Sequence, residues 1–282
     1  MGMALITLLL ILGFPLTNEE GGNESRKSRA EKGLDIMESA FDRFHINYEM
    51  SRVHNFGYYK ETVSKRQNDI YEAEGIVDIY IPCNLNKRLE AMISPIKTRK
   101  KIYRKVDEDK LIEGHAAEMA RSSIWRGNSF LNEKERSQYQ YMQVGDTLFN
   151  DRDSYIISFT PLKKFGKTKG TLFVDKESLA IVHMEYSPIF DTNKSIWKSI
   201  KWTEDFEFKE GAFVLTEVKF KGITYDGYIY NSLLKMDRLE VVSEIPEHEL
   251  FLPMGASLFG NAQELDEETF WDGFTFLKPK SE

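Results

Sequence analysis

The pattern of apolar and polar positions begins with a helical repeat. Ala30, Leu34, Met37, Phe41 and Phe44 recur at spacings of three and four, which places them on one stripe of an amphipathic helix. Charged residues occupy the positions between them and face water. We therefore expect an N-terminal helix that buries this stripe against the rest of the chain.

From residue 54 onward the pattern changes to alternation, which is typical of strands. Residues 56–63 and 71–81 predict an antiparallel pair joined by a polar turn. Further strands are predicted over residues 139–144, 154–160, 170–174, 179–186, 202–208, 213–220 and 228–242. Because strands and helices do not alternate, the predicted fold class is mainly β (α+β): a curved antiparallel sheet or half-barrel packed on an N-terminal amphipathic helix, with a helical insertion.

The chain divides into an apolar leader, a linker and one domain. Residues 4–16 are almost continuously apolar, a length typical of a signal-peptide core and shorter than the about 20 residues of a spanning helix. We therefore expect residues 1–17 to be a signal-like segment and the protein to be exported, with no transmembrane span after leader removal. The alternative is that the apolar residues 4–16 form a hydrophobic strand or helix of the mature domain. Residues 18–27 are the expected linker and 28–282 a single β-rich domain, in which 107–137 form a helical insertion and 262–282 an acidic, aromatic tail.

Charge and cysteine content narrow the function classes. The formal net charge is -7, which argues against binding to nucleic acid or non-specifically to an anionic bilayer. The basic stretch 97–105 is either a phosphate or lipid head-group site or, the reading we favour, an edge strand protected by lysines. Cys83 is the single cysteine, so no intrachain disulfide forms, and we expect it to be a small buried hydrophobe.

Catalytic and metal-binding patterns are missing from the sequence. No two of the five histidines have metal-ligand spacing: His45, His54, His115, His183 and His248. The pairs Asp151 with Asp153 and Glu204 with Asp205 provide carboxylates for glycosidase-type chemistry, but nothing in the sequence separates their pKa values. We therefore predict no catalytic residues, no metal and no cofactor.

A set of short motifs in a fixed order resembles a known family. The motifs lie at residues 40–48, 57–61, 71–73, 153–159, 170–181 and 268–271. They resemble the region after the β-sandwich in the carboxypeptidase-like regulatory domain-containing envelope proteins of Bacteroidetes. That small β-sandwich has no counterpart in this sequence. The resemblance implies a half-barrel fold similar to outer-membrane lipoprotein carriers, with an apolar cavity and no catalytic residues.

Three functional hypotheses follow. The first is a non-catalytic protein of the periplasm or the periplasmic face of the outer membrane, which binds a hydrophobic ligand (a lipid or an acylated protein) or an outer-membrane protein partner. Its candidate cavity residues are Tyr155, Ile157, Phe159, Phe173, Phe206 and Phe208. The second is a structural or interaction module whose interior is filled by its own side chains. The third, a glycan-acting enzyme, requires two carboxylates facing each other across a cleft.

Overall fold

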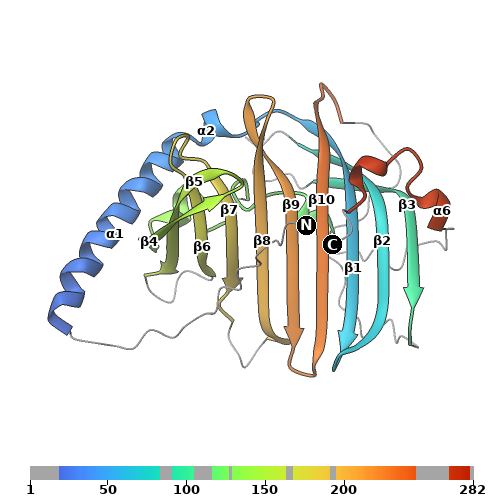
Figure 1. The fold of residues 1–282 in the computed structure, drawn as a ribbon, viewed down its shortest axis with the longest axis horizontal. Coiled ribbons are helices and arrows are strands. Elements are labelled where there is room, and N and C mark those ends of the chain that lie inside the picture. Colours follow the sequence, from blue (N-terminus) through green and yellow to red (C-terminus); the bar gives the residue numbers. More distant parts are fainter. Residues whose placement is uncertain are drawn as a thin grey trace, which may run out of the picture.

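Ten strands form one antiparallel sheet in the computed structural model, which describes residues 19–82, 91–104, 116–126, 129–162, 168–190, 195–245 and 267–279 (Figure 1). The strands are β1 (Val53–Lys65), β2 (Asn68–Ile81), β3 (Met92–Ile102), β4 (Tyr139–Phe149), β5 (Arg152–Pro161), β6 (Thr168–Asp175), β7 (Ile181–Pro188), β8 (Trp197–Lys209), β9 (Ala212–Thr224) and β10 (Tyr228–Val241). The helices are α1 (Glu19–Asp42), α2 (Phe44–Asn47), α3 (Ala116–Met119), α4 (Glu133–Arg136), α6 (Glu267–Phe270) and the 3₁₀ helix η2 (Thr275–Leu277). Each predicted strand is confirmed, and most extend beyond the predicted bounds.

The strand order is β3-β2-β1-β10-β9-β8-β7-β6-β5-β4, so the first hairpin is added beside the last strand of a long meander. In this order β3 and β4 are the two edges, and the described sheet does not close. The connection from β3 to β4 must therefore cross the whole sheet. We call residues 116–126 and 129–137 of this connection the crossing segment. It contains the short helices α3 and α4.

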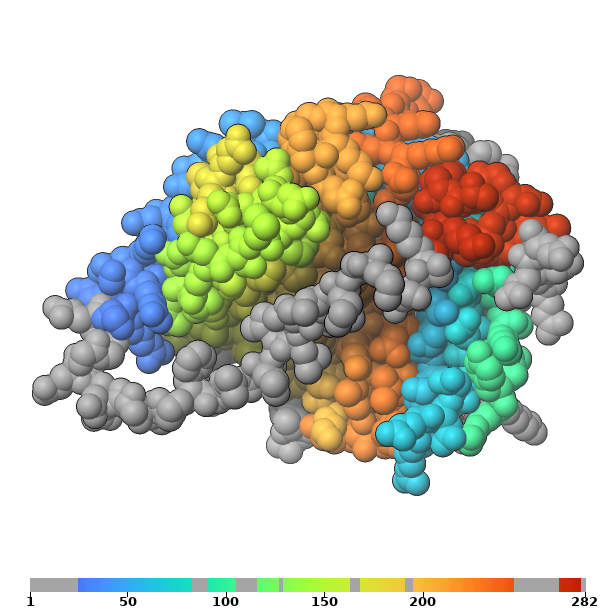
Figure 2. All heavy atoms as spheres, in the orientation of Figure 1, coloured from blue at the N-terminus to red at the C-terminus, as the bar shows by residue number. Residues whose placement is uncertain are grey.

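The two faces of the sheet have different surroundings. The core face carries Tyr59, Val77 and Leu234, which are fully buried and pack in one cluster with α1, α2 and the crossing segment. The outer face carries side chains such as Lys60 and Leu233 on the same strands. Figure 2 shows the outer face, where the surface over β8, β9 and β10 is set back between β4 and β5 on one side and the tail on the other.

Helix α1 packs against the edge strand β4 through a slightly different stripe from the predicted one. Met37 and Phe41 are buried as expected, but Leu34 is 44% exposed. Gly33 lies at the closest approach, where an added Cβ would be 2.7 Å from the Met142 Cα. Because the tightest contact is centred on this glycine, Leu34 is rotated out of the interface. Its exposure corrects the predicted stripe.

The expected linker 18–27 is largely helical, because α1 begins at Glu19. Glycine lowers helix stability by only about 1 kcal/mol relative to alanine, and no proline interrupts this segment. The polar, glycine-containing composition therefore did not end the helix. The signal-like segment 1–17 lies outside the described residues, as do Cys83, His115 and His248.

The C-terminal tail packs on the outer face at the β1–β3 end of the sheet. Phe270 and Leu277 are buried there in a second apolar cluster with Tyr58 and Ile76. The edge strand β3 supports this contact, because Lys97 Nζ donates to the backbone carbonyls of Thr269 and Asp272, both at 2.9 Å. The basic stretch is thus an edge strand, as favoured from the sequence, and part of it holds the tail.

Candidate binding sites on the two faces of the sheet

Three of the six predicted cavity residues are part of the packed core. Ile157 and Phe159 are fully buried on the core face of β5, and Phe206 is buried beside Tyr48 at a ring distance of 5.6 Å. Phe159 stacks on Phe130 of the crossing segment, with ring centroids 4.2 Å apart. These three side chains therefore contact other side chains and leave little space for a ligand.

The other three lie elsewhere. Phe173 is paired with Ile156, so it lies on the opposite face from Ile157, next to His183 at 4.6 Å. Lys176 lies over the Tyr155 ring at 5.3 Å, and Phe208 is 55% exposed at the end of β8. The six residues do not line one cavity, because aromatic content alone does not tell which face a strand residue occupies.

A buried carboxylate fixes the crossing segment to the core face. Glu204 of β8 is 2% exposed and accepts hydrogen bonds from Ser122 Oγ at 2.6 Å, from Ser123 Oγ at 2.6 Å and from the Ser123 backbone N–H at 3.1 Å. Tyr186 Oη donates a further bond at 2.7 Å. Burial raises the pKa of Tyr186 well above its ordinary value, and the Glu204 charge raises it further, so the phenol stays protonated as a donor.

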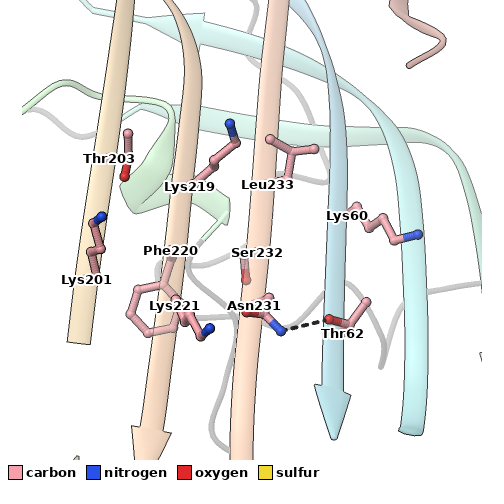
Figure 3. Close-up of a pocket in the computed structure, with 10 residues that line it drawn as sticks. All are labelled: Lys60, Thr62, Lys201, Thr203, Lys219, Phe220, Lys221, Asn231, Ser232 and Leu233. Atoms are coloured by element: carbon pink, nitrogen blue, oxygen red, sulfur yellow. Dashed lines mark hydrogen bonds between the residues drawn. The ribbon is translucent and has the colours of Figure 1, made fainter. Parts of the chain in front are cut away.

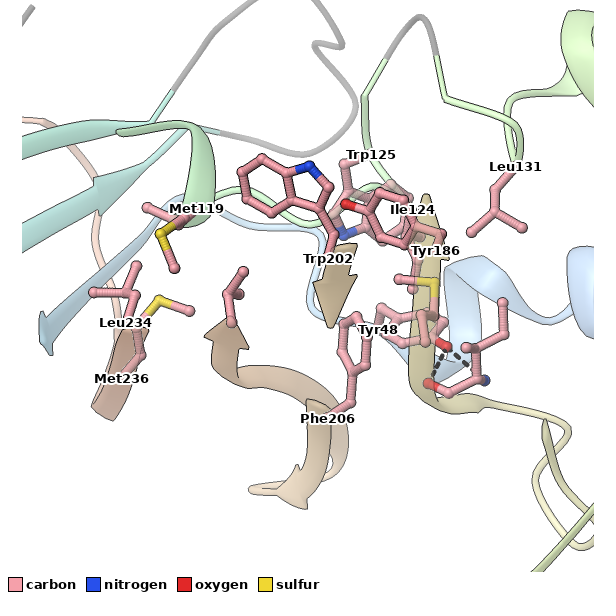
Figure 4. Packing of buried hydrophobic residues seen from close by; sticks show 14 of the residues in the cluster. Tyr48, Met119, Ile124, Trp125, Leu131, Tyr186, Trp202, Phe206, Leu234 and Met236 are labelled. Carbon is pink, nitrogen blue, oxygen red and sulfur yellow. Dashed lines mark hydrogen bonds between the residues drawn. The ribbon is translucent and has the colours of Figure 1, made fainter. Parts of the chain in front are cut away.

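Tyr48 makes the corresponding connection between α2 and the sheet. Its hydroxyl donates to the Ile181 carbonyl at 2.8 Å and accepts from the Ile181 N–H at 2.7 Å. Burial raises the pKa of Tyr48 well above its ordinary value. Its ring contacts Trp125 at 6.0 Å, so a helix, a strand and the crossing segment meet around one tyrosine (Figure 4).

A pocket of about 390 Å³ opens where α1 and α2 meet the crossing segment. We call it the aromatic pocket. Its apolar lining is Phe41, Phe44, Met50, Ile124, Trp125 and Leu131, and its polar lining is Asp42, His45, Glu133 and Arg136. The Arg136 guanidinium lies 4.6 Å from the centre of the Phe41 ring. The volume falls within the range of about 300–1,000 Å³ that is typical of small-molecule sites.

Behind the aromatic pocket lies a much smaller cavity of about 40 Å³. Its lining comes from Tyr48, which follows α2, from the crossing segment and from the sheet, with Phe206 and Phe213 among the sheet residues. Trp125 lines both cavities.

The carboxylate pairs proposed from the sequence are not arranged for catalysis. Glu204 and Asp205 are neighbours in one strand and point to opposite faces, with Asp205 hydrogen-bonded to His183 Nδ1. Asp151 and Asp153 are exposed at the β4–β5 turn. Among the residues that the structure describes, no group of three or more His, Cys, Asp or Glu side chains is placed to hold a metal ion.

No described helix combines the length and apolar character needed to cross a bilayer. No family model matches the chain, and no curated protein matches it. The resemblance to carboxypeptidase-like regulatory domain-containing proteins therefore stays a prediction.

Several solved structures align with most of the chain. A DUF1329 family protein from Desulfovibrio piger is 12% identical, with 78% of this chain and 95% of that chain covered and a TM-score of 0.38. A putative outer membrane lipoprotein-sorting protein domain from Vibrio parahaemolyticus is 15% identical, with 77% and 95% covered and a TM-score of 0.37. A LolA superfamily protein from Nitrosomonas europaea is 12% identical, with 76% and 95% covered and a TM-score of 0.32. We base no functional assignment on similarities of this size.

Proposed function

We propose that this protein is a non-catalytic binding protein of the cell envelope, and that the aromatic pocket takes an apolar group such as the acyl chain of a lipid or of an acylated protein. The observation that carries the proposal is the pocket itself. It combines a floor of aromatic and aliphatic side chains with a charged rim at the junction of α1, α2 and the crossing segment. Export to the periplasm, or to the periplasmic face of the outer membrane, is part of the same proposal.

The lining explains which ligands fit. Phe41, Phe44 and Trp125 line the pocket and are almost completely buried by the protein. An apolar chain placed there gains about 25 cal/mol for each Å² removed from water. At the rim, Arg136 offers a cation to a carboxylate or phosphate group, whereas Glu133 and Asp42 favour a zwitterionic head. The pocket therefore suits an amphiphile better than a sugar.

A structural or interaction module is the second candidate function. The cavity beside Tyr48 holds only about 40 Å³, so an acyl chain does not fit into it without displacing side chains. A structural or interaction module needs no such space. In that case the same aromatic pocket receives apolar side chains of an envelope protein partner rather than a lipid tail.

The binding test uses a fluorescent polyene fatty acid, whose absorption overlaps tryptophan emission. The part of the energy transfer that a Trp125→Phe variant loses reports its arrival in the aromatic pocket, because Trp125 is one of four tryptophans. We expect saturable energy transfer with the full chain. Met50→Asp puts a carboxylate against the apolar lining and should weaken binding at least about tenfold. Ile46→Asp is the matched control, because Ile46 is 75% exposed on the neighbouring turn of α2 and does not line the pocket.

Two results contradict the lipid proposal. The first is no saturable binding by the full chain, and the second is equal binding by the Met50→Asp and Ile46→Asp variants. If the fatty acid fails but a partner protein from the envelope crosslinks at position 50 and not at position 46, the second candidate function is supported instead.

A further inference from the structure

The outer face carries a second hollow, of about 370 Å³, over β1, β10, β9 and β8 (Figure 3). We call it the lysine groove. Its lining residues are Lys60, Thr62, Lys201, Thr203, Lys219, Phe220, Lys221, Asn231, Ser232 and Leu233. Four of them are lysines and none is acidic, although the whole chain has a net charge of -7. The lining of the groove is therefore basic, although carboxylates outside the lining pair with Lys60, Lys201 and Lys219.

The register of the strands explains why the groove is amphiphilic. Leu233 is the cross-strand neighbour of Lys60 on one side and of Lys219 on the other. Lysine side chains have long aliphatic stems, which can lie along apolar surface while the ammonium group stays in water. Leu233 and the flanking stems thus form an apolar floor with ammonium groups at its margins.

One cross-strand pair of lysines in the groove is unfavourable for the stability of the ligand-free protein. Lys201 and Lys221 lie directly opposite each other on β8 and β9. Like charges in that position destabilise an antiparallel pair. A local conflict of this kind is expected where a site serves a ligand rather than the fold, and an anion placed between the two ammonium groups would relieve it.

Neighbouring carboxylates hold most of the lysines without lining the groove. Lys60 Nζ lies 3.1 Å from both Glu72 and Glu74, and Lys201 Nζ lies 2.8 Å from Glu185. Glu217 forms ion pairs with Lys219 and with Lys235. The pair of Lys201 with Glu185 is exposed on both sides, and exposed ion pairs contribute little to stability, whereas Glu74 and Glu217 are largely buried. Lys201 can therefore turn toward an incoming anion at small cost.

A second outer-face hollow, of about 280 Å³, adjoins the lysine groove at Lys201, which lines both. This second hollow is rich in hydroxyl groups, from Ser158, Thr160, Thr171 and Ser187, and Lys169 and Glu185 line it as well. Hydroxyls and an ammonium group are suitable partners for the oxygens of a phosphate or carboxylate. The outer face therefore changes from an apolar floor at Leu233 to a polar surface beyond Lys201.

We propose that the outer face binds a single-chain anionic lipid, whose chain lies in the lysine groove over Leu233 and whose head group lies between Lys201 and Lys221. This site is separate from the aromatic pocket, which opens among α1, α2 and the crossing segment on the other side of the sheet, and it does not depend on the function proposed for that pocket. Charge complementarity selects the anionic head, and the apolar floor selects the chain.

The test measures binding of dodecyl phosphate, below its micelle concentration, to the full chain by calorimetry. Lys201→Gln with Lys221→Gln keeps the two stems and removes the charges, so we expect affinity to fall at least about tenfold. Lys27→Gln with Lys32→Gln removes the same charge from exposed positions of α1 and should change affinity by less than about twofold.

Three comparison ligands separate the contributions of the anionic head and the alkyl chain to binding. Inorganic phosphate has the charge without the chain, and dodecyl maltoside has the chain without the charge. Each should bind at least about tenfold more weakly than dodecyl phosphate. Leu233→Asn should weaken dodecyl phosphate and leave inorganic phosphate unchanged. Equal binding by the two double variants overturns the proposal, and so does a polyglutamate peptide that binds more tightly than dodecyl phosphate, because that result assigns the groove to an acidic protein partner.

The variants also provide a check that does not depend on ligand. If the Lys201–Lys221 pairing is a like-charge conflict, Lys221→Gln should raise the melting temperature of the ligand-free protein. A fall in melting temperature would show that Lys221 supports the sheet itself and would overturn the assignment of the pair to an anion.

Discussion

Replacing Glu204 by alanine tests whether one buried carboxylate holds the crossing segment on the sheet. The substitution removes the acceptor for the Ser122 and Ser123 hydroxyls, the Ser123 backbone N–H and the Tyr186 hydroxyl. Two of these groups have a remaining partner, since Ser123 Oγ and Tyr186 Oη lie 2.6 Å apart. The Ser122 hydroxyl and the Ser123 N–H are the two donors that depend most on the carboxylate.

The expected magnitude follows from this difference. A buried donor left without an acceptor costs about 1–3 kcal/mol, and hydrogen bonds to a charged group contribute about 1.5–3 kcal/mol each. With partial compensation by the hydroxyl pair, we expect Glu204→Ala to lower the free energy of unfolding by about 3 kcal/mol. Glu204→Gln keeps the shape and one acceptor oxygen, so its loss should be smaller, about 1 kcal/mol.

Urea unfolding, followed by tryptophan fluorescence, measures the change in the free energy of unfolding of the whole protein. Amide hydrogen exchange at residues 122–126 shows whether stability is lost in the crossing segment. We expect exchange in this stretch of the crossing segment to accelerate more than exchange in β9. Glu177→Ala, at an exposed turn position, is the control. If Glu204→Ala matches this control in both measurements, the carboxylate does not anchor the crossing segment.

Three further changes have defined outcomes. Gly33→Ala should destabilise the protein by about 1–3 kcal/mol in urea, because the new Cβ meets β4 backbone at 2.7 Å; a gain in stability would mean that helix propensity dominates. The hydrogen bond to Asp78 raises the pKa of His54, whereas burial lowers it. The stability that protonated His54 contributes to the fold is therefore fully present below about pH 6.5 and is lost as the pH rises through the folded-state pKa. His54→Asn should therefore reduce the fall in melting temperature between about pH 6 and about pH 8.5, and an unchanged pH profile would contradict this. Phe270→Ala should free the tail, measured as faster proteolytic cleavage within residues 267–279 than in a Lys278→Ala control.

The strands were predictable because each carries its own alternation of apolar and polar residues. In β2, for example, Val77 and Ile79 face the core and are fully buried. Ile76, on the other face, is fully buried too, and the reason lies about 200 residues away in Phe270 of the tail. Local sequence shows that a strand is apolar on both sides, but it does not show what covers the second side.

The candidate site was less predictable, because it depends on contacts between distant segments. The six apolar residues chosen from the sequence, five of them aromatic, do not share a location. Phe173 lies opposite Ile156 in the β5–β6 pair and therefore on the other face from Ile157. The residues of the aromatic pocket come from α1, α2 and the crossing segment, whose packing is set by the strand order. Only the lysine groove left a local signal, the alternating Lys219 and Lys221 of β9, which also fits an ordinary solvated strand.

The strand order also explains why binding sites are found on both faces. Because β3 and β4 lie at opposite edges, the connection between them crosses the sheet, and side chains of the crossing segment pack on the core face. The aromatic pocket opens beside this segment, and the lysine groove lies on the outer face over β1, β10, β9 and β8. If Glu204→Ala loosens the crossing segment as expected, the affinity of the aromatic pocket for the fatty-acid probe should change. The affinity of the lysine groove for dodecyl phosphate should stay the same, because the two sites share no lining residue.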